Sequence, residues 1–179
     1  MRKFLTVSFI SALTIGIAYL LPSSVWAEFG GLPAHPLIIH GVIVLLPLIA
    51  IFLLAGLFWK NHLRKLHLAL IGALAFSVVG VLAAKSSGYS LSTVVGLPKS
   101  HAQWGNYLVL IAIALFSSFV LLSFFTFHKK SKIASLSLRV LMALLAVSTI
   151  GMTYVVGHSG AESVWKYRYE IGKEQQGLP

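Results

Sequence analysis

Histidine is the residue type in this chain best suited to bind a metal ion or a haem, and four of its seven histidines stand at the ends of apolar segments. His35 and His40 open one such segment. His101 opens another, and His158 closes a third. An imidazole at the rim of a hydrocarbon layer is costly unless it has a partner, so it marks a candidate functional site. We therefore expect these four side chains to gather at one face of a membrane protein.

The chemistry of such a site is limited by the residues that the chain lacks. There is no cysteine, which excludes thiolate metal sites, disulfides and iron-sulfur clusters held by cysteine. Aspartate is also absent, so a Ser-His-Asp set is impossible, and the chain has only four acidic residues. We make no prediction of an enzymatic reaction and name no catalytic residue.

A b-type haem is the occupant that we favour, with electron transfer as its function. Such a haem needs two neutral imidazoles from different helices and a slot for the flat macrocycle. The pair that we expect is His40 with His158 or His101, since His40 lies deepest. Glycines near the imidazoles could leave the slot open. They are Gly41, Gly105 and Gly151.

Lys99 or Lys85 could bind the haem propionates at the rim. Two alternatives stay open. Three or four converging histidines, from the set of His35, His40, His101 and His158, could instead bind copper or zinc without any cysteine. The histidines could also only cap helices and form hydrogen bonds across the bundle, which would make the protein a non-catalytic membrane scaffold.

The composition places these residues in an integral membrane protein. Hydrophobic residues make up 58% of the chain and charged residues only 10%, and its mean hydropathy is +0.89. The formal charge of +10 comes from short basic clusters between apolar runs, which argues against nucleic-acid binding. The lipid bilayer is the expected partner, together with a redox protein or a quinone.

We predict an all-α protein, a four-helix membrane bundle preceded by a signal peptide. Residues 1–27 have the basic start, apolar middle and small-residue end of a signal peptide, with cleavage after Ala27. The alternative is a retained first helix and five spans. Residues 28–160 form the membrane domain, and residues 161–179 form a polar, aromatic external tail. The four predicted spans are Pro36–Trp59, Leu66–Ala84, His101–Phe127 and Leu138–Gly157.

Several local signals set the ends of these spans. Ser86-Ser-Gly88 predicts a turn within a polar connection from Lys85 to Ser100. Ser100 with Gln103 resembles a capping box, and Ser159-Gly160 predicts a stop after His158.

The distribution of lysine and arginine predicts the topology. Residues 60–65 and 128–132 form basic loops, which the positive-inside rule places in the cytoplasm of a bacterium. Both ends of the mature chain are then outside the inner membrane. His62, His67 and His128 fall on the inner side, and the four candidate histidines fall on the outer side.

Several motifs carry a resemblance. They are Leu32-Pro-Ala-His-Pro-Leu-Ile-Ile-His40, Val44-Leu-Leu-Pro47, Ala84-Lys-Ser-Ser-Gly88, Lys99-Ser-His-Ala102 and Gly157-His-Ser-Gly-Ala161 with Val164-Trp165. With them the chain resembles an uncharacterised family of small bacterial membrane proteins, a domain of unknown function that is sometimes joined to redox modules. The resemblance implies a four-helix membrane domain whose signature positions are the four candidate histidines, and it implies no activity.

Overall fold

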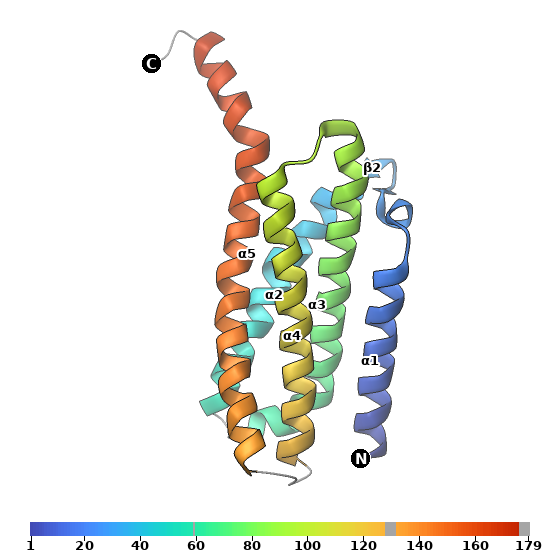
Figure 1. The fold of residues 1–179 in the computed structure, drawn as a ribbon, viewed down its shortest axis with the longest axis vertical. Coiled ribbons are helices and arrows are strands. Elements are labelled where there is room, and N and C mark those ends of the chain that lie inside the picture. The colour runs from blue at the N-terminus through green and yellow to red at the C-terminus, as the bar shows by residue number, and fades with distance from the viewer. Residues whose placement is uncertain (59, 128–131, 176–179) are drawn as a thin grey trace.

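The fold is a bundle of long helices, shown in Figure 1. The computed structural model describes residues 1–58, 60–127 and 132–175. The helices are α1 (Arg2–Leu20), α2 (Ala34–Phe58), α3 (Lys60–Val95), α4 (Lys99–Phe127) and α5 (Lys132–Gln175). A short 3-10 helix, η1 (Ser23–Trp26), and a two-stranded antiparallel hairpin, β1 (Glu28–Phe29) and β2 (Leu32–Pro33), connect α1 to α2.

All five of the long helices that the structure describes are long and apolar enough to cross a membrane. The prediction of a helical membrane protein is therefore confirmed, whereas the count of four spans is not. The segment that we predict to be a signal peptide forms α1, which packs along α3 through Phe4, Ser11 and Ala18. Cleavage after Ala27 stays a prediction, and so does the five-span alternative.

Helices α2 to α5 pack as a ring of four, because α3 contacts α2 and α4 while α5 also contacts α2 and α4. About half of the most apolar stretch of α3, and of that of α4, is buried inside the bundle. In α2 and α5 the buried share is about a fifth. The core between them is aliphatic, with Leu46, Leu53, Ile71, Leu74 and Leu115 fully buried. Since lipid and core are equally apolar, this packing relies on close fit more than on removal from water.

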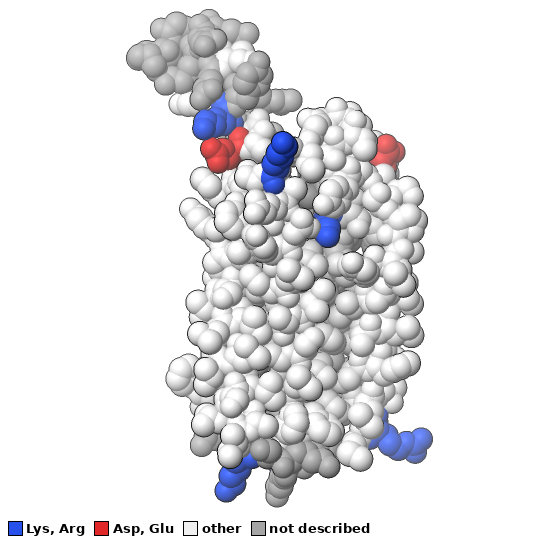
Figure 2. All heavy atoms as spheres, in the orientation of Figure 1, with Lys and Arg blue, Asp and Glu red and all other residues white. Residues whose placement is uncertain are grey.

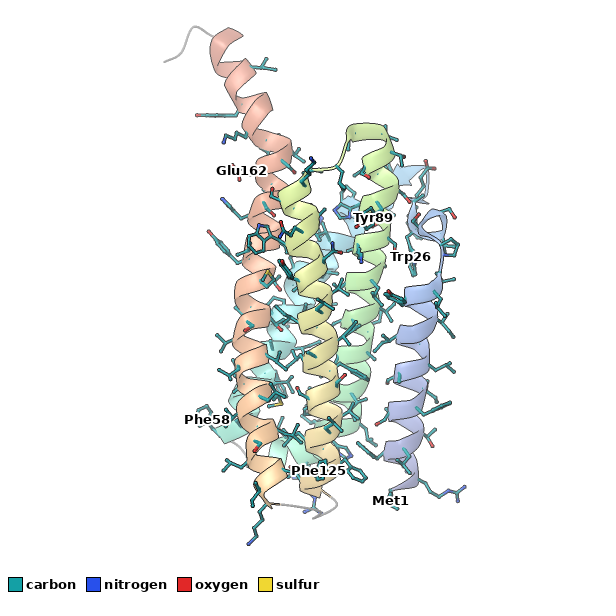
Figure 3. The ribbon with its side chains drawn as sticks, viewed as in Figure 1. Met1, Trp26, Phe58, Tyr89, Phe125 and Glu162 are labelled. Atoms are coloured by element: carbon teal, nitrogen blue, oxygen red, sulfur yellow. The ribbon has the colours of Figure 1, made fainter. Side chains whose placement is uncertain are left out.

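The two ends of the bundle differ in charge, and Figure 2 shows an uncharged band between them. We call the end that carries the starts of α2 and α4 the histidine end, and the opposite end the basic end. Figure 3 places Tyr89 and Glu162 at the histidine end and Met1 and Phe125 at the basic end. The basic residues described at the basic end are Arg2, Lys3, Arg64, Lys65, Lys132 and Arg139. Which end faces the cytoplasm stays a prediction.

Helix α3 is longer than predicted. It continues beyond Ala84 to Val95, so our prediction of a turn at Ser86-Ser-Gly88 is wrong. Within this segment, hydroxyl groups donate to the backbone carbonyl three residues earlier, as Ser87 does to Ala84 and Thr93 does to Ser90. These bonds let serine and threonine stay helical. The chain turns at Gly96 instead, whose φ of 85° is favourable only for glycine.

Helix α5 also passes its predicted end. It runs through Ser159-Gly160 to Gln175, so the expected stop is wrong, and residues 161–175 are helical rather than irregular or extended. Ser163 donates to the Gly160 carbonyl, and Lys166 pairs with Glu162 one turn before it, which supports the extension. The last four residues of the predicted tail lie outside the described residues.

The starts of α2 and α4 lie slightly earlier than predicted. Helix α4 begins at Lys99, with the Ala102 amide donating to the Pro98 carbonyl, so Ser100 lies inside the helix and is not its cap. Helix α2 begins at Ala34, which puts His35 in its first turn rather than before it. The predicted end of the third span at Phe127 is confirmed.

The junction of α2 and α3 gives a test of the packing. A Cβ added at Gly56 would overlap the Leu63 side chain, lying 2.7 Å from its Cγ. We expect Gly56→Ala to lower the stability by about 1–3 kcal/mol, the usual cost of overpacking. Thermal unfolding of the purified protein in detergent measures this change.

Gly72→Ala is the matched control, because a Cβ at Gly72 of α3 meets nothing within 4 Å. Alanine is the better helix former, so this variant should be as stable as the wild type or more stable, by up to about 1 kcal/mol. Equal behaviour of the two variants would contradict the close approach of α2 and α3.

Candidate functional site

The four candidate histidines lie at the histidine end of the bundle. His35 is in the first turn of α2 and His101 in the first turn of α4. His158 lies on α5 at the same end, because its neighbour Ser159 contacts His101. His67 lies at the basic end, where its Nδ1 is 2.7 Å from the Arg64 carbonyl oxygen. His128 and the side chain of His62 lie outside what the structure describes.

Two of the four candidates, His35 and His101, come together. Their ring centroids are 6.1 Å apart, and the ring planes are nearly perpendicular at 82°. Both side chains are half-buried. We call these two residues the histidine pair. They come from different helices and are separated by more than sixty residues in sequence.

The hydrogen bonds of His35 determine which of its nitrogens carries a proton. Its Nδ1 lies 2.8 Å from the Ala84 carbonyl oxygen and 3.3 Å from the Ser87 hydroxyl, both on α3. A carbonyl oxygen only accepts, so Nδ1 of His35 must carry the hydrogen and donate it. In the neutral ring, Nε2 then keeps a free lone pair.

The same reasoning applies to His101. Its Nδ1 lies 3.1 Å from the Ser159 hydroxyl oxygen on α5. Ser159 already donates its own hydrogen to the Val156 carbonyl at 3.0 Å, so the hydroxyl accepts from His101. The neutral ring of His101 is thus also protonated at Nδ1, and its Nε2 also has a lone pair.

The pair therefore brings together two neutral imidazoles that can each donate an Nε2 lone pair. A hydrogen bond from the second ring nitrogen to a carbonyl or hydroxyl is the usual support of a metal-binding histidine, because it fixes the tautomer and raises the basicity of the ring. The arrangement can share a proton between the rings or ligate a metal ion or haem iron. Within residues 1–58, 60–127 and 132–175, no three His or Glu residues gather closely enough to hold a metal ion.

His40 and His158 belong to a different surface. His40 donates from Nδ1 to the Pro36 carbonyl in its own helix and is exposed. His158 stacks on Tyr154, with centroids 5.9 Å apart and planes at 12°. It lines an open hollow of about 380 Å³ between α2 and α5. The other lining residues are Ile43, Pro47, Ile150, Thr153, Tyr154 and Gly157.

The pairing that we expected, His40 with His158 or His101, is thus not the one that the structure assembles. His35 and His40 are five residues apart, which separates them by about 140° around the helix. Since His35 faces α3 and α4, His40 is directed elsewhere. In the same way His158 precedes Ser159, so the two side chains differ by about 100° and only Ser159 reaches His101.

The glycines that contact the pair are not those that we expected. A Cβ added at Gly88 of α3 would lie 3.1 Å from Cε1 of His35, and one at Gly160 of α5 would lie 3.0 Å from Cε1 of His101. Glycine at these two positions lets the imidazole rings lie directly against helix backbones. A Cβ added at any of the predicted slot glycines would meet nothing within 4 Å apart from its chain neighbours, so there is open space beside them. They are Gly41, Gly105 and Gly151.

Comparison with known proteins supports the membrane fold. A family profile described as "Predicted membrane protein (DUF2231)" matches residues 31–173, which include the whole of α2 to α4 and nearly all of α5. The chain belongs to this family. The match to DUF2231 leaves out α1 but contains the histidine pair and all its hydrogen-bond partners. No curated protein and no solved structure matches the chain.

Sequence reasoning missed the groups that hold the pair, namely the Ala84 carbonyl, Ser87, Gly88, Ser159 and Gly160. A signal for them was present, because the Ser-Gly of Ser87-Gly88 has a counterpart in Ser159-Gly160. We interpreted both as breaks in a helix. In the structure each pair supplies a hydroxyl group and an open backbone to one imidazole.

The tautomers of the pair can be tested by nitrogen NMR on protein with labelled histidine. We expect His35 and His101 to be protonated at Nδ1 when neutral, because of their acceptors on α3 and α5. Ser159→Ala should weaken this preference for His101, which keeps the Val156 carbonyl as an acceptor, and leave His35 unchanged. Protonation of both rings at Nε2 in the wild type would contradict the assigned hydrogen bonds.

Proposed function

We propose that the histidine pair binds a b-type haem and that the protein transfers electrons at the membrane surface. The observation that carries the proposal is the approach of His35 and His101 with both Nε2 lone pairs available. His35 and His101 would hold the haem iron through their Nε2 atoms. The family gives only the coarser statement of a membrane protein whose function is unknown.

The number of ligands favours this occupant over tetrahedral zinc. The pair offers two imidazoles, whose ring centroids lie 6.1 Å apart. A tetrahedral site also needs further ligands, whereas the part of the chain that the structure describes has no third His or Glu beside the pair.

The donor residues suit the group. They are neutral imidazoles, and the chain has no cysteine that would compete for the iron. Lys85 follows the Ala84 carbonyl that holds His35, and Lys99 lies two residues before His101. Both ammonium groups lie at the histidine end, where they could bind the propionates.

The chain's own residues would orient and insulate the haem. The Ala84 carbonyl and the Ser159 hydroxyl fix the two rings, so that their Nε2 atoms are presented without rotation. Gly88 and Gly160 keep the rings close to α3 and α5. A bound haem would supply reversible one-electron chemistry, and the site's position would allow exchange with a quinone or a soluble redox protein.

Absorption spectroscopy tests the proposal. Protein purified from haem-supplied cells should be red, with a sharp α band on reduction. His35→Ala and His101→Ala should each lose most of the bound haem, because each removes one of the two imidazoles that would hold the iron. His67→Ala is the matched control, since His67 also donates through Nδ1 to a carbonyl but lies at the basic end.

Three results would overturn the proposal. Loss of haem from His40→Ala and His158→Ala but not from variants of the pair would assign the ligands to His40 and His158. Colourless protein that contains copper or zinc by elemental analysis would replace haem with a metal ion. Protein without either would leave a membrane scaffold.

A further inference from the structure

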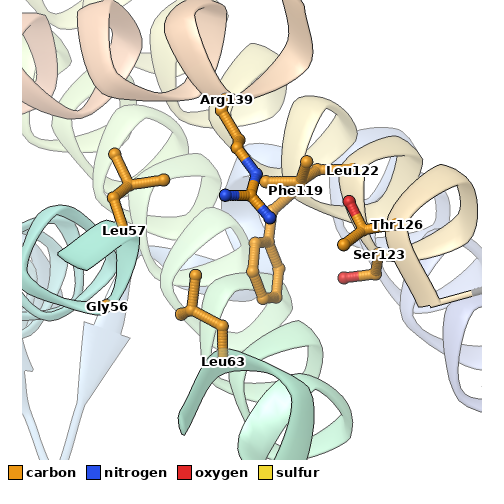
Figure 4. A pocket seen from close by; sticks show the side chains of 8 residues that line it. All are labelled: Gly56, Leu57, Leu63, Phe119, Leu122, Ser123, Thr126 and Arg139. Carbon is orange, nitrogen blue, oxygen red and sulfur yellow. The ribbon is translucent and has the colours of Figure 1, made fainter. Parts of the chain in front are cut away.

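A second site candidate lies at the basic end of the bundle, far from the histidine pair. Figure 4 shows a small hollow between the α2–α3 junction, α4 and α5. Its volume is about 20 Å³. The residues that line it are Gly56, Leu57, Leu63, Phe119, Leu122, Ser123, Thr126 and Arg139.

Arg139 brings an unneutralised positive charge into this hollow. Figure 4 shows its guanidinium group reaching from α5 toward the side chains of α4. The group is half-buried, yet the one ion pair within the described ranges is Lys166 with Glu162 at the other end of the molecule. A half-buried charge without a counter-ion is costly, so an anion from outside the chain would stabilise it.

Ser123 adds a hydrogen-bond donor to the same hollow. Its side chain is 0% exposed, and its hydroxyl oxygen has no hydrogen-bond partner. Serine in a helix usually bonds to a carbonyl of the preceding turn, as Ser118 does to Leu115. The hydroxyl of Thr126, by contrast, is bonded to Ser135 at 2.7 Å. The hollow is thus lined by a hydroxyl and a guanidinium that have no partner within the described part of the chain.

We propose that Arg139 and Ser123 bind one oxygen atom of a phosphate group, and that an anionic lipid headgroup supplies it. A guanidinium and a hydroxyl both donate hydrogen bonds, which is the chemistry that recognises a phosphate oxygen. The hollow has room for a single oxygen-sized atom, so the rest of the phosphate lies at its mouth.

The position of the hollow favours a lipid over free phosphate. It lies near the start of α3 and the start of α5, where Arg64, Lys65 and Lys132 are exposed. Such a cluster at the end of membrane helices attracts anionic headgroups. Arg139 lies seven residues beyond Lys132, or about 10 Å along the helix, so its long side chain could reach an inserted phosphate oxygen.

A thermal-shift titration of the full chain in detergent tests the proposal. The probes are phosphatidylglycerol, phosphatidylcholine and inorganic phosphate. We expect phosphatidylglycerol to raise the unfolding temperature of the wild type more than phosphatidylcholine does. Arg139→Gln should weaken the apparent affinity for phosphatidylglycerol roughly tenfold or more, as loss of a charge-assisted contact does. Arg2→Gln, which removes an exposed arginine of α1 at the same end but outside this cluster, should change it little.

Ser123→Ala separates a ligand contact from a structural one. Without lipid, removing an unpartnered buried hydroxyl should leave the protein equally stable or more stable. With phosphatidylglycerol, its thermal shift should be smaller than that of the wild type. Equal shifts in wild type and Arg139→Gln, or equal shifts with both lipids, would overturn the proposal. A shift with inorganic phosphate alone that depends on Arg139 would overturn the lipid as the source.

Discussion

The hydrogen bond from His35 to the Ala84 carbonyl is the contact on which the histidine end depends. It joins the first turn of α2 to α3, and with the Ser159 contact it connects the ring of four helices through two imidazoles. An imidazole at the edge of an apolar bundle needs such acceptors, because an unsatisfied donor there costs several kcal/mol. The same bonds determine the tautomers, so they fix both the structure and the chemistry of the pair.

Much of the fold could be predicted from the sequence, because apolar runs of membrane length are strong signals. The runs that became α2, α3, α4 and α5 are each where the hydropathy places them. The ends of α3 and α5 could not be predicted in this way. Glycine weakens a helix through its backbone freedom, and serine weakens it through side-chain hydrogen bonds that favour other conformations. The hydroxyls of Ser87 and Ser163 instead donate to carbonyls within the helix, which continues past them.

The candidate site could be predicted only in part. The predicted spans and basic loops place the four histidines at one end of the bundle, and they lie at one end in the structure. Which imidazoles meet depends on rotation around each helix. His35 and His40 share a helix and a motif, yet about 140° separates them, so only one can face α4. That choice depends on the extension of α3, which carries the partners of His35 to the level of α2's first turn.

The scarcity of acidic residues explains why both ends have incomplete polar sites. Four glutamates serve the whole chain, and the two with described side chains, Glu28 and Glu162, are exposed at the histidine end. Arg139 consequently faces a hollow that contains a free hydroxyl and no carboxylate. Among the described residues, the histidine pair likewise has no third His or Glu beside it. A buried polar group needs a partner, and within the described ranges no carboxylate supplies one to Arg139 or to the pair.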